Sequence, residues 1–199
     1  MEIVDLKRVD ELWAPTQPYI VAQIMDEYGK TSGDALELGP FAGGIAIELK
    51  KQYPGLNITI ADEQPEVIDF IRQKVARAGF AGKIAVKKSD LGKLDFKDES
   101  FDLVIFRGAF FFLPEKENLL DEIFRVMKQG GLAFIGGGHG RGVPQHIINE
   151  IASDLRTLHG KLGGRYLSIA DLNRVVSRSS IKDKYLIKED GGTWLNIRK

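Results

Sequence analysis

Short apolar runs alternate with longer periodic stretches along most of this chain. The runs are rich in Ile, Leu, Val and Phe, as expected of strands that are buried within a sheet. They predict strands over residues 35–38, 57–61, 83–88, 101–106 and 132–135. In the periodic stretches apolar residues recur every three or four positions, which is typical of amphipathic helices. These stretches predict helices over residues 16–28, 44–53, 65–78, 119–127 and 147–158, and a further helix after Ser168.

The alternating order of strands and helices predicts a parallel sheet with helices on both faces. Near the end of the chain, two strands over 184–188 and 193–198 flank Asp190-Gly191-Gly192, a sequence that favours an antiparallel hairpin. Ser168 and Asp171 have the spacing of a capping box at a helix start. The predicted fold class is therefore α/β, a Rossmann-like doubly wound sheet that is mostly parallel and ends in an antiparallel hairpin.

Glycines punctuate these elements. Gly29 is placed to end the first helix in a left-handed conformation, and Gly130-Gly131 to end the helix over 119–127. The glycine-rich segment 136–142 is predicted to be a loop after the strand over 132–135. In open α/β sheets such loops lie at the carboxyl ends of the strands, where ligands bind.

Composition excludes several classes of partner and of chemistry for this chain. Its 199 residues carry 28 basic and 28 acidic side chains, and no dense Lys/Arg stripe, so we expect no nucleic-acid partner. The absence of Cys excludes disulfides and cysteine nucleophiles, and fits a cytoplasmic location. No apolar run is long enough to span a membrane, so no membrane partner is expected. The length favours one domain.

Acidic residues end three successive predicted strands: Glu37, Asp62 and Asp90. The carboxyl ends of parallel strands meet at one edge of a sheet, and a glycine turn follows Glu37. Asp62 and Asp90 could each simply cap a helix N-terminus. Three acidic tips in register with a glycine-rich first turn instead favour a nucleoside cofactor site.

The segment 37–44, Glu-Leu-Gly-Pro-Phe-Ala-Gly-Gly, resembles motif I of class I S-adenosylmethionine-dependent methyltransferases. Asp62 matches the acidic residue of that family at the end of its second strand, and Ser89-Asp90 the pair after the third. The segments 96–104 and 124–131 resemble the family sequences around its fourth strand and before its fifth. The likeness covers about residues 33–136, and order and spacing agree throughout.

The resemblance implies S-adenosyl-L-methionine as the cofactor. Asp62 would accept hydrogen bonds from the ribose hydroxyls, and Asp90 with the Leu91 backbone would contact the adenine. Glu37 would orient the motif I turn and favour the ammonium of the cofactor. The full set of implied cofactor-binding residues is Glu37, Gly39, Phe41, Gly43, Asp62, Glu63, Asp90, Leu91 and Arg107.

Two of these positions leave alternatives open. The family has a small residue where this chain has Phe41, and a side chain there restricts the approach of the backbone to a ligand. A binding protein without turnover is therefore one alternative. A nucleotide-dependent oxidoreductase is another, although the dinucleotide fingerprint would require Gly at position 41. Arg107 could face the methionine carboxylate, the substrate, or a neighbouring acidic side chain in a salt bridge.

The acceptor side offers fewer signals. His139, in the loop after the fifth parallel strand, is the best-placed general base, and it is also a candidate substrate contact. Phe111 and Trp13 are further candidates for contact with the substrate, although core packing explains aromatic residues equally well. His146 and His159 fall on or near a helix, and the three histidines have no spacing that predicts a metal site.

We therefore expect a methyltransferase that positions a small-molecule acceptor for in-line attack on the cofactor. Its single domain would comprise an N-terminal helical lid segment over 1–32, a cofactor-binding core over 33–136, and C-terminal helices with a hairpin over 137–199. The sequence leaves the oligomeric state and the acceptor atom undetermined.

Overall fold

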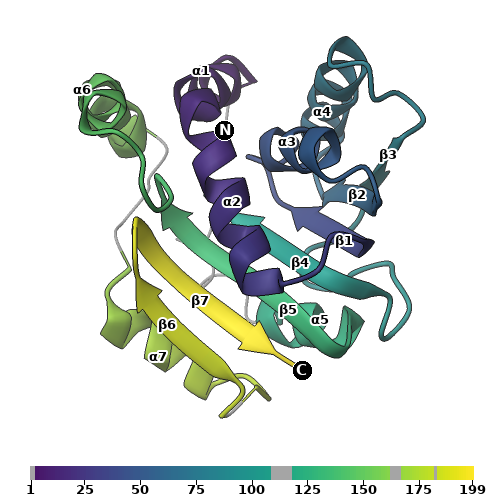
Figure 1. Ribbon diagram of the computed structural model, residues 1–199. Helices are drawn as coiled ribbons and strands as arrows, with labels where there is room; N and C mark the ends of the chain where they lie inside the picture. The colour runs from purple at the N-terminus through teal and green to yellow at the C-terminus, as the bar shows by residue number, and fades with distance from the viewer. Residues whose placement is uncertain (1–2, 109–117, 162–166, 182) are drawn as a thin grey trace.

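A seven-stranded sheet forms the centre of the protein. The computed structural model describes residues 3–108, 118–161, 167–181 and 183–199. The strands lie side by side in the order β3-β2-β1-β4-β5-β7-β6 (Figure 1). Their bounds are β1 Gly33–Leu38, β2 Leu56–Asp62, β3 Ile84–Lys88, β4 Phe101–Arg107, β5 Met127–Gly138, β6 Tyr185–Glu189 and β7 Gly192–Arg198. The five strands from β1 to β5 are parallel, and β7 pairs antiparallel with both β5 and β6. The predicted fold class is confirmed.

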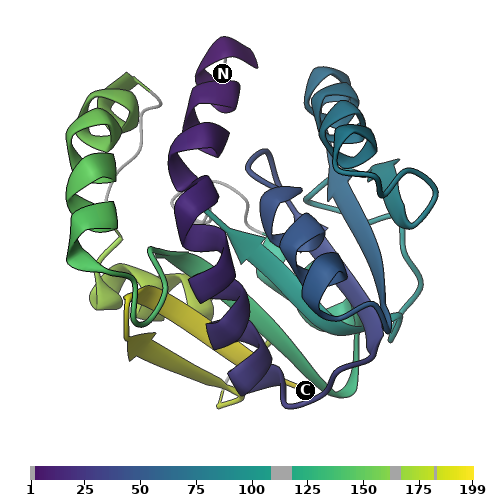
Figure 2. The ribbon, with the colours of Figure 1, turned by 45° about the horizontal axis from the view of Figure 1, so that its top comes forward.

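Helices cover both faces of this sheet. In Figures 1 and 2, α1 and α2 form a long rod that crosses one face beside α3 and α4, and α5 and α7 pack on the opposite face. The sixth helix lies alongside α1. The helix bounds are α1 Ile3–Trp13, the 3-10 turn η1 Ala14–Thr16, α2 Gln17–Tyr28, α3 Gly44–Gln52, α4 Pro65–Arg77, α5 Leu119–Val126, α6 Gln145–Lys161 and α7 Ile169–Ser177.

Alternation along the strands divides the apolar residues between two cores. Along β4, Leu103 and Ile105 point toward the layer of α2, α3 and α4, whereas Val104 and Phe106 point toward α5 and α7. All four side chains are buried, as expected for a parallel strand that is covered on both faces. Because the alternation continues to the strand ends, it also decides which face each polar residue at the carboxyl edge approaches.

Several local predictions are confirmed. Gly29 ends α2 in a left-handed conformation with φ of 71°, and its N–H donates to the Met25 carbonyl. Ser168 and Asp171 form the predicted capping box at the start of α7. The hairpin between β6 and β7 turns at the predicted glycines.

Two predictions about element boundaries are wrong. The helix over 119–127 ends at Val126, and β5 already begins at Met127, which pairs with Phe101 of β4. Gly130 and Gly131 do not end a helix but exchange backbone hydrogen bonds with Lys199 at the end of the chain. The strand also continues through Gly138, so the loop predicted over 136–142 begins three residues later.

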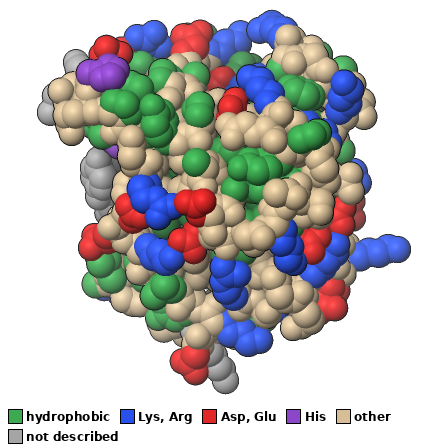
Figure 3. All heavy atoms as spheres, viewed as in Figure 1, with side chains coloured by type: hydrophobic (Ala, Val, Ile, Leu, Met, Phe, Trp, Pro, Cys, Tyr) green, Lys and Arg blue, Asp and Glu red, His purple; other side chains and the backbone are tan. Residues whose placement is uncertain are grey.

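Charged side chains of both signs are interspersed on the face drawn in Figure 3. Ion pairs join separate elements of the chain, such as Arg141 with Asp26 of α2 at 2.5 Å. Within the described part of the chain, no helix has the length and apolar character needed to cross a bilayer.

Candidate functional site

Glu37 holds the glycine turn between β1 and α3. Its side chain is buried at 2% exposure, and Oε2 accepts hydrogen bonds from the backbone N–H groups of Gly43 at 2.8 Å and Ala46 at 3.0 Å. Burial raises the pKa of Glu37 above its ordinary value, although the Gly43 N–H and the positive charge of Lys74 oppose this effect. The carboxyl group thus fixes the path of the turn and satisfies donors at the start of α3.

The turn needs glycine at two points. Gly39 and Gly43 have φ of 94° and 97°, in the left-handed region that residues with a Cβ avoid. Phe41 is not among the residues with positive φ, and its half-buried ring lies against Gly108, where an added Cβ would be 3.4 Å from it. The ring therefore packs over the end of β4 and does not strain the turn.

Asp62 ends β2 with a fully buried side chain. Its Oδ1 accepts a hydrogen bond of 2.8 Å from the backbone N–H of Gln64, close to the start of α4. In the parallel register Glu37 pairs with Ile60, so Asp62, two residues later, approaches the same face of the sheet as Glu37. The structure thus brings two of the three predicted acidic tips to one face of the carboxyl edge. Glu63 follows Asp62 and is half-buried.

Asp90 differs from this buried pair in its exposure. It is exposed in the turn after β3, and its Oδ1 accepts a hydrogen bond of 2.7 Å from the Gly92 N–H. The adjacent Leu91 is buried in the core that includes Leu38 and Ala61. The Asp90 carboxylate therefore closes its own turn after the edge strand β3. The next element along the chain is β4, so Asp90 does not cap a helix.

A second group of predicted residues gathers at the ends of β4 and β5. The guanidinium of Arg107 lies 4.1 Å from the centre of the Trp13 ring, and its Nη2 donates to the Gly138 carbonyl at 3.1 Å. The Trp13 and His139 ring centres are 5.1 Å apart. Trp13 comes from the end of α1, so the N-terminal helix reaches the predicted acceptor side of the edge. Phe111 lies outside the described residues.

Burial shapes the titration of this second group. It lowers the pKa of Arg107 to about 10, while the charge of Glu37 opposes the shift. Burial and then the charge of Arg107 lower the pKa of His139, so its imidazole is neutral at pH 7. Among the residues that the structure describes, Arg107 forms no salt bridge, so the predicted alternative of an acidic partner is not found there.

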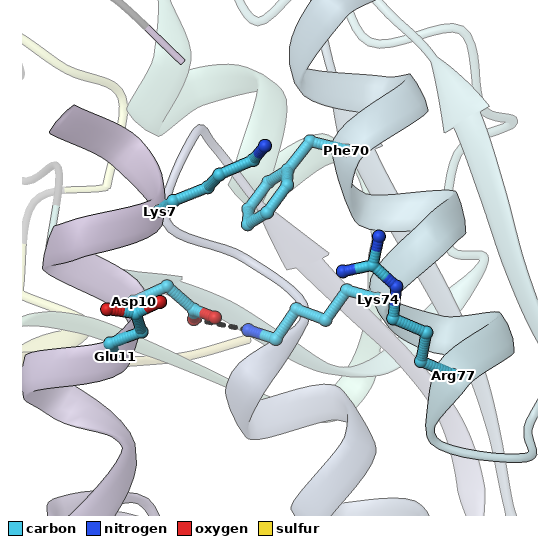
Figure 4. Close-up of a pocket in the computed structure, with 6 residues that line it drawn as sticks. All are labelled: Lys7, Asp10, Glu11, Phe70, Lys74 and Arg77. Carbon is cyan, nitrogen blue, oxygen red and sulfur yellow. Dashed lines mark hydrogen bonds and ion pairs between the residues drawn. The ribbon is translucent and has the colours of Figure 1, made fainter. Parts of the chain in front are cut away.

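A hollow of about 210 Å³ lies between α1 and α4. Figure 4 shows Lys7 and Phe70 facing one another across it, with the ion pair between Asp10 and Lys74 at its base. None of the predicted site residues that the structure describes lines this hollow. Lys74 nevertheless connects it to the motif I turn, because a Cβ at Gly43 would lie 3.8 Å from the Lys74 amine.

Sequence reasoning missed Lys74 and Asp10. Lys74 borders the apolar stripe of α4, next to the buried residues Ile71 and Val75, and a cation at such a position is the signal that could have found it. Asp10 carries no comparable signal, because its partner lies on a distant segment of the chain.

The residues at the β1 and β2 tips fit S-adenosylmethionine. The backbone at Gly39 and Gly43 carries no side chain that could block a ligand, and the Phe41 ring is directed onto Gly108. A buried carboxylate at the end of β2 suits ribose hydroxyls, because ionised carboxylate oxygens accept hydrogen bonds only.

Comparison with known protein families gives one match that covers half of the chain. The profile of the family described as "Methyltransferase domain" matches residues 36–135, which span β1 through most of β5. The matched segment contains the motif I turn, Asp62, Asp90 and Arg107.

Curated relatives match the same part of the chain. A ubiquinone/menaquinone biosynthesis C-methyltransferase of Geotalea daltonii is 29% identical over 105 residues, 52% of this chain and 45% of the relative. A sterol 24-C-methyltransferase of Neurospora crassa is 33% identical over 113 residues, 57% of this chain and 29% of the relative. The chain spans less than half the length of these curated relatives.

A solved structure matches nearly the whole chain. A Methanococcus maripaludis protein assigned to the S-adenosyl-L-methionine-dependent methyltransferases has a TM-score of 0.83 and 27% identity. The match covers 98% of this chain and 91% of that protein. The similarity therefore includes the N-terminal helices and the final hairpin as well as the central strands.

Proposed function

Because this chain belongs to the methyltransferase domain family, we propose that it transfers a methyl group from its cofactor, S-adenosylmethionine, to a small-molecule acceptor. The observation that carries the proposal is the glycine turn between β1 and α3, held by the buried Glu37 beside the buried Asp62. The names of the curated relatives, which concern quinone biosynthesis and sterols, support a small acceptor.

The proposed roles at the cofactor side follow from the geometry. Glu37 keeps the turn in one conformation, so the backbone of Gly39 to Gly43 can lie close to the ligand. Asp62 accepts hydrogen bonds from the ribose, and Leu91 with its neighbour Asp90 borders the adenine. The bound sulfonium supplies a methyl group on an already activated leaving group, so the protein has mainly to orient the acceptor and exclude water.

His139 is the proposed base for acceptors that must lose a proton. It is half-buried next to Trp13 and Arg107, and its lowered pKa keeps the imidazole in the basic, neutral form at pH 7. The neutral imidazole can therefore accept a proton without first losing one.

Calorimetry and methyl transfer together test the proposal. We expect the purified protein to bind S-adenosylhomocysteine and not NAD(H), and to transfer label from S-adenosylmethionine carrying a tritiated methyl group to members of a panel of phenols, quinols and carboxylic acids. Binding of NAD(H) without S-adenosylhomocysteine would contradict the assignment. Tight S-adenosylhomocysteine binding with no transfer to any acceptor would favour the alternative of a binding protein without turnover.

A further inference from the structure

Arg107 is a buried cation whose hydrogen-bonding capacity is only partly used. The residue is 6% exposed, and its Nη2 donates to the Gly138 carbonyl. Its Nε is buried and has no hydrogen-bond partner within the described ranges of the chain. The neighbouring His139 has the same property, because its Nε2 is also buried and unpartnered there. A buried donor without a partner costs free energy, so such groups call for a specific explanation.

The carboxylates whose charges act on Arg107 have other partners. Glu37 accepts hydrogen bonds from Gly43 and Ala46, and Asp10 forms an ion pair with Lys74. Neither carboxylate forms an ion pair with the guanidinium in the described part of the structure. The fold thus places a buried positive charge at the carboxyl edge and leaves its Nε–H for another group.

Charge is distributed unevenly along this edge. The acidic tips Glu37, Asp62 and Asp90 belong to β1, β2 and the turn after β3, whereas Arg107 and His139 belong to β4 and the end of β5. The guanidinium donates toward β5, which lies on the side of β4 away from the motif I turn. The acidic half suits the nucleoside, and the basic half suits a ligand with an oxyanion.

Resting on the proposed function, we propose that Arg107, His139 and Trp13 form the subsite for an oxyanion of the methyl acceptor, and that the acceptor is a small carboxylic acid. The planar guanidinium fork matches a carboxylate, and an imidazole nitrogen can add a further hydrogen bond. The indole of Trp13 supplies an apolar wall for the part of the acceptor next to the acid.

The helix that carries Trp13 is attached in a way that fits this role. In α1 only Leu6 and Val9 are buried, and polar contacts hold the helix on both sides: Arg8 with Asp154 of α6 at 2.5 Å, and Asp10 with Lys74 of α4. An element with few buried apolar residues can shift at low cost, so the Trp13 ring can adjust its position against an acceptor that reaches the Nε of Arg107.

Binding of matched acids and amides tests the proposal. Calorimetry of the protein saturated with S-adenosylhomocysteine would compare benzoate with benzamide, phenylacetate with phenylacetamide, and acetate with acetamide. We expect at least one acid to bind about tenfold or more tightly than its amide, the size of one charge-assisted hydrogen bond. Arg107→Met should abolish this preference. Arg141→Met, which removes an exposed guanidinium two residues beyond His139, should leave it unchanged.

The outcomes separate this inference from the proposed function. If the wild type fails to bind S-adenosylhomocysteine, the proposed function itself fails. If it binds that ligand but prefers none of the acids, only the acceptor subsite is overturned. The oxyanion could also be the carboxylate of the cofactor. In that case Arg107→Met would weaken the binding of S-adenosylhomocysteine but not that of methylthioadenosine, which lacks that carboxylate. This result would show that the acceptor assignment is wrong.

A second variant covers the case in which Arg107→Met does not fold. Trp13→Leu removes the aromatic wall at a half-buried position and leaves Arg107 in place. It should weaken the binding of phenylacetate and benzoate more than that of acetate. The affinity for S-adenosylhomocysteine should stay within about twofold of the wild-type value. Equal weakening of all three acids, or none, would contradict the role of Trp13.

Discussion

At the scale of single residues, the carboxyl edge contains two buried carboxyl groups with different tasks. Glu37 satisfies backbone donors of the motif I turn, so its role is to position the backbone that meets the cofactor. Asp62 lies at the tip of the next strand on the same face, where it can accept hydrogen bonds from a ligand. Both residues were found from sequence, because an acidic residue at the end of an apolar strand is an unusual choice that local packing does not require.

Replacing Asp62 tests its proposed contact with the ribose. Asp62→Ala should weaken the binding of S-adenosylhomocysteine by about 1.5–3 kcal/mol, the range for hydrogen bonds to a charged group. Calorimetry measures this change in affinity. Asp69→Ala is the matched control, because Asp69 is an exposed acidic residue on α4 whose carboxylate pairs with Arg72. A folded Asp62→Ala protein with unchanged affinity would remove Asp62 from the site.

The pH dependence of turnover tests His139. Its folded-state pKa lies below the ordinary value of 6.5, so the basic form persists at neutral pH and is lost only as the pH falls through that lower pKa. The value of kcat/KM should therefore decline at acidic pH, with a midpoint below the ordinary histidine pKa of 6.5.

His139→Ala should lose this acidic limb and about 10²-fold in turnover, if the acceptor must lose a proton. His146→Ala, an exposed histidine on α6, should retain the wild-type profile. An unchanged profile in His139→Ala would rule out the role of base.

At the scale of elements, the N-terminal helices differ most from the prediction. The sequence predicts one helix over 16–28, but the structure has α1, a 3-10 turn and α2 in succession. In α1, Leu6, Val9 and Trp13 follow one another at helical spacing, but only Leu6 and Val9 are buried, so the apolar pattern is short. Besides the buried Leu6 and Val9, ion pairs with α4 and α6 hold this helix, and no local pattern encodes such partners.

The capping box of α7 permits a direct measurement of how much one helix terminus contributes to the free energy of unfolding. Ser168 Oγ accepts from the Asp171 N–H at 3.1 Å, and Asp171 Oδ2 accepts from the Ser168 N–H at 3.1 Å. Ser168→Ala should lower the free energy of unfolding by about 1 kcal/mol in urea titrations. Ser177→Ala, at the exposed end of the same helix, should have a smaller effect. Equal effects would mean that the box does not stabilise α7.

At the scale of the whole molecule, β5 joins the parallel half of the sheet to the antiparallel hairpin. It pairs with β4 on one side and with β7 on the other, and the glycines at its end allow β7 to approach closely. A Cβ at Gly136 would lie 2.1 Å from the Thr193 carbonyl oxygen. The same strand end provides Gly138 for the contact with Arg107, so sheet assembly and the acceptor side depend on one segment.

Alanine at Gly136 should disrupt this junction. Gly136 and Gly130 both have positive φ, at 152° and 74°, but a Cβ at Gly130 would meet no atom within 4 Å. Gly136→Ala should therefore lose about 2–3 kcal/mol more unfolding free energy than Gly130→Ala, the cost of overpacking against backbone. Urea titration of both variants measures the difference, and equal losses would show that the close approach of β7 is not required.

The sequence by itself determined the order and type of most elements and the identity of the family. Those features are local: the alternation around Ile105, the acidic tips Glu37 and Asp62, and the turn after Leu38 can each be found within a few residues of the chain.

Only the tertiary structure decided which residues meet across distant segments. It stacked the Trp13 ring on the guanidinium of Arg107 and paired the backbone of β5 with Lys199 by hydrogen bonds. It also brought the Lys74 amine close to Gly43 of the motif I turn. The physical reason is that burial, ion pairing and ring contact depend on where separate helices pack, and the period of a hydrophobic pattern indicates which face is buried without naming the partner.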